Sequence, residues 1–445
     1  MRSPTSPVTI GTIPIKVVQM SQNVFVLGLD EANQQVLEAM PGAEEFTFHQ
    51  LLTQEEMQQG QVDVLALLER AEAQLDAFSG SVDAIVSYWD FPGTLMVPIL
   101  CRRRGLPSAD LEAVVRCEHK YWSRLIQSRV IDSMPAFGLL DLEAETPRLP
   151  EGVTYPAWIK PVQSASSEGA YYIENDDDLA RTLPLAREDV VRMGEPFEDV
   201  LAMLDVPPEI AKAGGAAYMA EEAAQGQQMT IEGFVADDQV HVYGLVQSVN
   251  YPDSSSFLRY QYPANVPDAV VDQMRMISEQ VISAAGLNNS TFNIEYFWDE
   301  GTGRVRLLEV NARHSQSHAS MFDMVDGVPN HYAMVALALG QRPELPEDRG
   351  PYPMAAKWFR RHFSDGVVTR VPTPDQIARF EQRVPGTTVD LAVTEGVRLS
   401  ETELQDSYSY ALAELVTGGQ DEADLQRKYE AFLASLPIHI DNEES

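Results

Sequence analysis

The segment FNIEYFWDEGTGRVRLLEVNARH, residues 292–314, carries the strongest structural signal in this 445-residue chain. Apolar residues alternate with polar ones on both sides of the turn DEGTG, which predicts a hairpin of strands 291–298 and 304–310. Leu308 and Val310 share one face of the second strand, and we expect that face to be buried.

The other face of the hairpin concentrates polar groups. Period-two alternation places Asn293 and Glu295 together on the first strand, and Glu309, Asn311 and Arg313 together on the second. Carboxylate and amide oxygens are the ligands that Mg²⁺ prefers, alongside phosphate oxygens and water. An arginine two residues beyond suits a phosphate or a developing charge. The pattern predicts a cleft that holds metal and phosphate, and a solvated edge hairpin is the alternative.

A second segment, AWIKPVQSASSEGAYYI at residues 157–173, suggests phosphate binding. Lys160 ends an apolar strand, and the small-residue loop 164–169 leads into a returning strand. Such a loop can lay backbone N–H groups over phosphates, although it lacks the P-loop pattern G-x-x-x-x-G-K-[ST]. Small-residue hairpin loops are also common without any ligand.

Together these segments resemble the ATP-grasp superfamily, with motifs in the same order over about residues 108–345. The resemblance implies an α/β ATP-grasp fold that uses ATP and Mg²⁺, with Mn²⁺ as a substitute. It implies three metal ligands, Glu295, Glu309 and Asn311, and a phosphate contact by Arg313. The implied nucleotide-binding residues are Lys120, Lys160, Ser166, Ser167, Gly169, Glu221, Glu222, Ala223, Ala224 and Gln228.

The chain departs from the family pattern at two places. Where many relatives have an acidic ribose ligand, this chain has Gln228, and nearby Glu232 is the alternative or faces solvent. Two residues before Glu295, where relatives are often basic, it has Asn293.

The residues that follow Glu309, Asn311 and Arg313 help to distinguish the class of reaction. Biotin carboxylases have a glutamate for bicarbonate where this chain has Ser317. The layout is more similar to carboxylate–amine ligases, notably L-amino acid ligases, which implies an acyl phosphate attacked by an amine. Arg259, in a loop, and His318 are the further catalytic candidates, and His314 is considered with them. Surface or structural roles are equally open for all three.

Charge and cysteine content limit the classes of partner and the cellular compartment that we expect. The chain has 67 acidic and 32 basic residues, a net charge of −35, so nucleic acid and anionic membranes are poor partners. It has two cysteines, Cys101 and Cys117, and no apolar run long enough to span a membrane. We expect a cytoplasmic enzyme that acts on a small carboxylate and a small amine, with a homodimer possible.

Alternating strands and helices over residues 20–108 predict a doubly wound parallel sheet. Trp89 and Asp90 end one of its strands and are candidates for the substrate pocket. The acidic stretch 183–216 suggests a surface insertion. In the C-terminal segment, strands 355–359 and 367–371 read as a hairpin. There we interpret three cations, Lys357, Arg360 and Arg361, as surface charges.

These observations predict three units: an N-terminal α/β domain, an ATP-grasp domain and a C-terminal mixed α/β segment. We expect a linker helix to carry Lys120. The expected bounds are 1–107 for the first unit, 108–345 for the second (linker helix 108–133, nucleotide-clamping subdomain 155–235, metal-binding subdomain 236–345) and 346–445 for the third.

Overall fold

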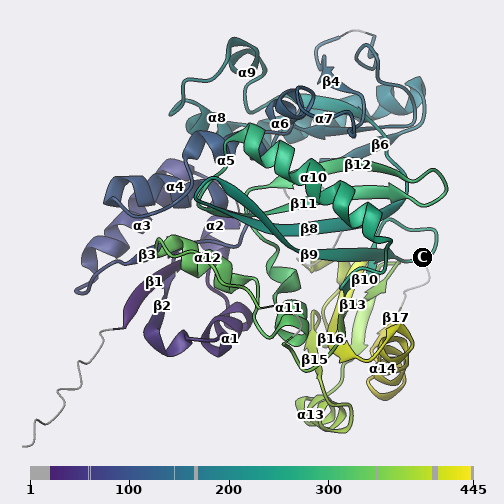
Figure 1. Ribbon diagram of the computed structural model, residues 1–445. Coiled ribbons are helices and arrows are strands. Elements are labelled where there is room, and N and C mark those ends of the chain that lie inside the picture. The colour runs from purple at the N-terminus through teal and green to yellow at the C-terminus, as the bar shows by residue number, and fades with distance from the viewer. Residues whose placement is uncertain are drawn as a thin grey trace, which may run out of the picture.

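The computed structural model describes residues 21–58, 60, 62–144, 146–164, 169–346, 349–402 and 409–441, apart from the side chains of residues 191–193 and 195 (Figure 1). Within these residues the strands form sheets of three, four, eight and two strands. In the part of the chain described, no helix is long and apolar enough to cross a membrane.

The N-terminal sheet is parallel, in the order β2-β1-β3, as the alternating pattern predicts. Asp30 and Asp63 begin two of its helices by accepting hydrogen bonds from backbone N–H groups in the first turn. Strand β2 is not predicted from the sequence, because its residues are mostly half-buried and mix polar with apolar types. The elements are β1 (Gln22–Leu27), α1 (Glu31–Ala39), η1 (Ala43–Glu45), β2 (Phe46–Leu51), α2 (Gln54–Gln58), α3 (Val64–Ala77), β3 (Ala84–Val86) and α4 (Gly93–Arg104).

Two helices, not the single linker helix expected, lead from this unit to the next sheet. They are α5 (Leu111–Glu118) and α6 (Lys120–Gln127). His119 separates them in an extended conformation, and its side chain accepts from Trp122 N at the start of α6. The break makes Lys120 the first residue of a helix.

The four-stranded sheet is antiparallel, in the order β4-β7-β5-β6. The expected surface insertion at 183–216 is instead helical and packed against the rest of the protein. Despite the acidic composition, apolar residues recur at helical spacing, and Leu183, Ala186, Phe197 and Ile210 among them are buried. The elements are β4 (Phe137–Leu140), β5 (Ala157–Pro161), β6 (Tyr171–Ile173), α7 (Asp176–Met193), α8 (Glu195–Leu201), α9 (Pro208–Ala213) and β7 (Tyr218–Glu222).

The eight-stranded sheet, called the main sheet below, has the order β12-β11-β8-β9-β10-β13-β16-β15 and occupies the centre of the molecule (Figure 1). Helix α10 packs on strands β8, β9 and β12 of this sheet. The central elements are β8 (Gln227–Ala236), β9 (Gln239–Asn250), β10 (Phe257–Tyr262), α10 (Asp268–Ala285), β11 (Ser290–Asp299), β12 (Arg304–Asn311), η2 (Gln316–His318), α11 (Ala319–Asp326) and α12 (His331–Ala338).

The C-terminal segment continues the main sheet through β13, β16 and β15. The expected hairpin of 355–359 with 367–371 is wrong, because β14 pairs with β17 at the C-terminus and β13 lies between β10 and β16. The elements are β13 (Met354–His362), β14 (Val367–Arg370), α13 (Pro374–Arg383), β15 (Thr387–Leu391), η3 (Leu399–Glu401), β16 (Tyr410–Gly419), α14 (Glu422–Ser435) and β17 (His439–Asp441).

Candidate active site

The hairpin β11–β12 forms as the sequence predicts, and it aligns two carboxylates. Glu295 lies directly opposite Glu309, and Asn293 opposite Asn311. The strict alternation fails at one point, because a bulge follows this pair and sets Tyr296 opposite Leu307. The residue buried beside Val310 is therefore Leu307, whereas Leu308 is half-buried.

Two like charges facing each other across strands are unfavourable unless a cation lies between or beside them. Burial, together with the facing Glu309 carboxylate, raises the pKa of Glu295 to about 7. Gln228, on β8, donates from Nε2 to Glu295 Oε2 at 2.8 Å. The structure thus places Gln228 against a candidate metal ligand.

Lys120 supplies one positive charge to this pair. Its Nζ lies 2.8 Å from Glu309 Oε1 and donates to the carbonyl of Ser164 at 2.8 Å. Burial lowers the pKa of Lys120, but Glu309 and the neighbouring carboxylates outweigh this and raise the pKa above its usual value. Lys120 therefore joins β12 to the start of the small-residue loop.

Lys160 lies in a second buried ion cluster. Its Nζ is 2.8 Å from Glu221 Oε2, and Arg124 Nε donates to Glu221 Oε1 at 2.6 Å. Burial opposes the charge on Glu221, yet Arg124 and Lys160 hold its pKa at about 2. Sequence analysis did not single out Arg124, although it lies four residues after Lys120 and so on the same helix face.

Arg124 also connects the four-stranded sheet to the main sheet. Its guanidinium donates to the carbonyls of Leu307 at 3.1 Å and Leu308 at 2.6 Å, at the bulge of β12. One side chain, 2% exposed, therefore ties Glu221 at the end of β7 to the β11–β12 hairpin.

Arg313 reaches the N-terminal unit. Its Nε donates to Asp90 Oδ1, and its Nη1 donates to the carbonyl of His314 at 3.1 Å. Burial lowers the pKa of Arg313, but Asp90 and Glu118 more than offset this. Asp90 thus lies at the site, as considered from the sequence, whereas Trp89 donates its Nε1 to Gly28 O at 2.8 Å and packs in the N-terminal unit.

His318 is buried beside a carboxylate. Its Nδ1 lies 2.7 Å from Glu232 Oε1, and Ser315 N donates to the same oxygen at 3.1 Å. Glu232 is fully buried, so it does not face solvent, and its carboxylate is bonded to His318 and Ser315. If the Nδ1 proton is donated to Glu232, Nε2 is the basic nitrogen of His318.

His314 has structural partners instead. Its Nδ1 lies 3.1 Å from Thr291 Oγ1, and its Nε2 lies 2.7 Å from His331 Nδ1. Burial, with His331 and Arg313 nearby, lowers the pKa of His314 well below its usual value. A neutral, fully bonded histidine of this kind stabilises the loop after β12.

The structure contradicts the proposed catalytic position of Arg259. The residue lies in strand β10, not in a loop, directly opposite Trp358 of β13. Its guanidinium stacks over the Trp358 ring at 4.9 Å and lies 3.6 Å from Glu422 Oε2 of α14. Alternation along β10 turns Arg259 to the face of the main sheet away from Glu295.

The segment expected to contact adenine follows β7. Glu222 accepts from Thr154 Oγ1 at 3.0 Å, and Ala223 N donates to Pro156 O at 2.9 Å. Ala224 comes next, half-buried, with no regular secondary structure. Adenine recognition here would have to use the Ala223 carbonyl or the backbone of Ala224.

The small-residue loop is described at its two ends. Ser166 and Ser167 lie outside the described residues. Gly169 has a φ of +68°, and its carbonyl accepts from Tyr218 Oη at 3.1 Å. The end of the loop is thereby tied to β7, the strand that carries Glu221.

The donor set at Glu295, Glu309 and Asn311 fits a hard cation. Asn311 donates its Nδ2 to Asn293 Oδ1 at 2.9 Å, which leaves the amide oxygen as its ligand atom. Among the described residues, no group of three His, Cys, Asp or Glu side chains has metal-binding geometry. Two carboxylates and an amide suit Mg²⁺, which keeps water and phosphate oxygens in its coordination shell.

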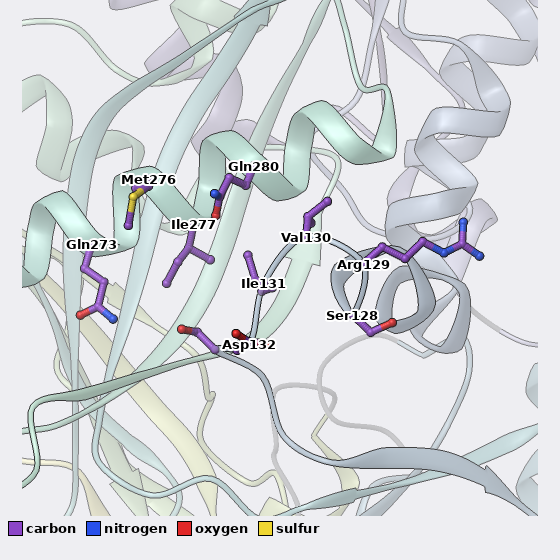
Figure 2. A pocket seen from close by; sticks show the side chains of 10 residues that line it. Ser128, Arg129, Val130, Ile131, Asp132, Gln273, Met276, Ile277 and Gln280 are labelled. Carbon is purple, nitrogen blue, oxygen red and sulfur yellow. The ribbon is translucent and has the colours of Figure 1, made fainter.

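One hollow lies away from these residues. A cavity of about 430 Å³ opens between α10 and the loop that follows α6 (Figure 2). Gln273, Met276 and Gln280 line one side of it, and Arg129 and Asp132 line the other. None of the candidate site residues borders this cavity, so it carries no argument about the chemistry.

Comparisons with known proteins bear on the fold of this chain. A family model for the ATP-grasp domain matches residues 153–320. The D-alanine–D-alanine ligase of Parasynechococcus marenigrum (strain WH8102) is 27% identical over 183 residues, which is 41% of this chain. The chain spans about half of that relative's length, 46%.

Solved structures show the same fold at low identity. An L-amino acid ligase from Bacillus licheniformis superposes with a TM-score of 0.68 at 15% identity, covering 95% of this chain and 100% of that one. The biotin carboxylase domain of a Hydrogenobacter thermophilus 2-oxoglutarate carboxylase gives 0.64 at 16% identity, covering 95% and 91%. This chain therefore carries an ATP-grasp domain and has the ATP-grasp fold.

Proposed function

We propose that the protein is an ATP- and Mg²⁺-dependent carboxylate–amine ligase that forms an amide bond and releases ADP and phosphate. The observation that carries the proposal is the facing pair Glu295–Glu309, bordered by Lys120 and followed by Asn311 and Arg313. The ligase names of the D-alanine–D-alanine ligase and the L-amino acid ligase support it.

In this proposal different residues of the chain bind different parts of ATP. Lys120 and Lys160, both buried, contact phosphate oxygens, and the backbone after Glu222 receives the adenine. Glu295, Glu309 and Asn311 hold Mg²⁺, with Mn²⁺ as a substitute. The bound cation supplies charge neutralisation for the transferring phosphoryl group.

The proposed reaction proceeds in two steps. A carboxylate oxygen of the first substrate attacks the γ-phosphorus, the bond to the β-phosphate oxygen breaks, and ADP leaves. The amine nitrogen of the second substrate then attacks the acyl carbon, and the bond to the phosphate oxygen breaks. Arg313 stabilises negative charge on the phosphoryl oxygens in this proposal.

The amine must lose a proton during the second step, and His318 is the proposed acceptor. Glu232 orients its ring and stabilises the imidazolium that forms, as a carboxylate does behind a general base. Proton transfer goes to Nε2, the nitrogen opposite the one bonded to Glu232.

A carboxylase is the alternative within the fold, and the 2-oxoglutarate carboxylase domain shares it. Ser317, half-exposed, stands where the family resemblance implies a glutamate for bicarbonate. A serine hydroxyl cannot act as the carboxylate base, so this residue favours the ligase. An inactive ATP-binding protein is the other alternative.

The test is phosphate release from Mg-ATP, screened against pools of amino acids and small carboxylic acids with pools of amines. Release that requires both an acid and an amine, and is not stimulated by bicarbonate, supports the ligase. Release with bicarbonate alone supports the carboxylase. ATP binding without release in any pool removes the small-molecule ligase proposal.

We propose unit bounds at 107/108 and 345/346, with the clamping subdomain at 155–235 and the metal-binding subdomain at 236–345. We also propose a cytoplasmic location. The carboxylase domain compared above is described as a dimer, and we propose a homodimer for this chain as well.

A further inference from the structure

The break between α5 and α6 directs three consecutive side chains to different partners. Glu118 Oε1 accepts from Ala312 N at 3.3 Å, just after the end of β12. Lys120 Nζ lies 2.8 Å from Glu309 Oε1, within β12. His119, between them, is 0% exposed. The proposed reaction uses Lys120 and leaves the buried ring of His119 without a role.

The two ring nitrogens of His119 make different hydrogen bonds. Nδ1 accepts from Trp122 N at 3.2 Å, in the first turn of α6, and Nε2 lies 3.2 Å from Gly214 O. A backbone N–H only donates and a carbonyl only accepts, so together the two contacts require a neutral ring with its proton on Nε2. Burial agrees with this, because it lowers the pKa of His119 to about 4.

The carbonyl that accepts from His119 is itself held in place. Gly214 caps the end of α9 with a φ of +64°, which glycine adopts without strain. A Cβ at this position would clash with Glu198 of α8, and Glu198 Oε1 accepts from Gly215 N at 2.6 Å. The Gly214 carbonyl is therefore a fixed acceptor that α8 supports.

Phe197 places α8 between His119 and the N-terminal unit. Its ring is fully buried and lies 5.9 Å from the His119 ring and 6.1 Å from the ring of Phe91, which precedes α4. Helix α8 also packs on α3 of the N-terminal unit. Helices α8 and α9, whose acidic composition suggested a surface insertion, thus connect the N-terminal unit to the two linker helices.

Backbone hydrogen bonds join the same region to Lys120. Lys120 N donates to Val162 O at 2.8 Å, and Val162 N donates to Ala217 O at 2.9 Å, three residues after Gly214. Lys120 Nζ also donates to Ser164 O at 2.8 Å. The position of the lysine between the small-residue loop and β12 therefore depends on how the start of α6 is held.

We propose that His119 is a positioning residue, and that its hydrogen bond from Nε2 to Gly214 O, called the latch below, sets Lys120 for contact with ATP. The latch holds the end of α9 against the start of α6, and the Lys120 ammonium then lies where the phosphate oxygens bind. The inference rests on the proposed function, in which Lys120 contacts phosphate, and adds a residue that acts through Lys120. A charged group displaced by about 1 Å loses much of its effect on a bound ligand.

Two substitutions separate the latch from the helix cap, because each keeps one of the two contacts of the ring. His119→Gln places an amide Nε2 near the imidazole Nε2, so it keeps the donor to Gly214 O and loses the acceptor for Trp122 N. His119→Asn keeps that acceptor, since asparagine is a good N-cap residue, but it is too short to reach Gly214. Calorimetric titration with Mg-ATP alone measures the Kd of each variant.

We expect the Kd for Mg-ATP to rise about 10-fold in His119→Asn and to stay within about 3-fold of the wild type in His119→Gln. The reverse order would overturn the proposal, because the helix cap and not the latch would then set the affinity. Should His119→Asn fail to fold, His119→Gln decides alone. A Kd within about 3-fold of the wild type supports the latch, and a larger rise counts against it.

A residue that acts through Lys120 has no effect once the lysine is gone. In a Lys120→Met background, His119→Asn should therefore leave the Kd for Mg-ATP unchanged, and an equal rise in both backgrounds contradicts the positioning role. His49→Asn is the matched control, because the His49 ring also stacks on a phenylalanine, Phe25, and its Nε2 lies 2.9 Å from Asn23 Oδ1 in the N-terminal unit. This variant should bind Mg-ATP as the wild type does. A rise equal to that of His119→Asn would show a general disturbance and refute the latch.

The outcomes separate the latch from the ligase proposal. If the wild type binds Mg-ATP but no acid and amine release phosphate, the ligase proposal fails and the Kd values still decide the latch. Equal Kd values for the wild type and His119→Asn overturn the latch and leave the ligase proposal intact. A wild-type protein that does not bind Mg-ATP removes both. Where substrates turn over, His119→Asn should raise the KM for ATP and leave the KM for the carboxylate unchanged, and an equal rise in both overturns the latch.

Discussion

The facing carboxylates of Glu295 and Glu309 should destabilise the fold by repulsion, and in the proposed function they bind Mg²⁺. Glu295→Gln removes one of two facing charges while Glu309 keeps its contact with Lys120. We expect this variant to be more stable than the wild type by about 1 kcal/mol without Mg²⁺. We also expect its Mg-ATP-dependent phosphate release to fall by about 100-fold or more. Calorimetry and the release assay measure both effects, and a lower melting temperature would contradict the expectation.

The second prediction concerns the free energy of unfolding of a variant at Arg124, which is a buried charge with many partners. Arg124→Met leaves Glu221 with Lys160 alone and removes the donors to two carbonyls of β12. Removing one partner of a buried ion pair costs about 3–5 kcal/mol. Urea unfolding measures the loss. The control is Arg129→Met, whose ion pair with Glu209 is 3.8 Å long and whose side chain is 69% exposed, so the change should stay within about 0.5 kcal/mol. Similar losses in both variants would argue against the role of Arg124.

At the scale of elements, the turn between β7 and β8 positions the segment expected to contact adenine. Gly226 has a φ of +132°, and a Cβ there would lie 2.4 Å from the backbone oxygen of Trp298 on β11. Gly226→Ala should therefore cost about 1–3 kcal/mol and raise the KM for ATP, because the turn must move away from β11. Gly303→Ala is the control: φ is +69°, but a Cβ would meet nothing within 4 Å. The difference between the two variants, by denaturant unfolding and ATP kinetics, isolates the contact with β11.

The elements also show what the sequence can predict. The hairpin that brings Glu295 opposite Glu309 could be predicted because alternation and the turn are local patterns within the 23 residues of that segment. The bulge at β12 was missed, because alternation cannot show where an extra residue enters a strand.

Long-range pairing explains the other misses. Arg259 was assigned to the site because no local pattern tells that β10 pairs with β13. That pairing joins residues about 100 positions apart, and it decides which face of the sheet Arg259 occupies. Asp90 contacts Arg313 from another unit, 223 residues away, which only the assembled fold reveals.

At the scale of the molecule, the charge is unevenly distributed. The net charge is −35, yet Lys120, Lys160 and Arg313 lie in the ion pairs of the candidate site, with Glu309, Glu221 and Asp90. A polyanion such as ATP would otherwise be repelled, so this local concentration of cations is what the proposed chemistry requires.

The last prediction concerns the response of the whole fold to acid. Burial lowers the pKa of His331 from 6.5 to about 4, and lowers the pKa of His119 likewise to about 4. The unfolded chain binds protons at these sites that the folded chain rejects, so stability falls as the pH drops from about 6.5 to about 4. Each site can contribute up to about 3 kcal/mol to this loss. Glu118 and Glu295, with pKa values raised to about 7, act in the opposite sense, since the folded state takes up their protons first and gains stability as the pH falls from 7 toward 4.5.

His331→Gln separates these effects. The amide can still donate to Asn33 Oδ1 and accept from His314, the two partners that lie at 2.8 and 2.7 Å from His331, but it cannot take up a proton. We expect its free energy of unfolding to fall less than that of the wild type between pH 6.5 and 4, by up to about 3 kcal/mol. His439→Gln, at an exposed position on β17, should follow the wild-type curve. Urea unfolding across this pH range measures the difference. Parallel curves for His331→Gln and the wild type would mean that another group, not His331, controls acid unfolding.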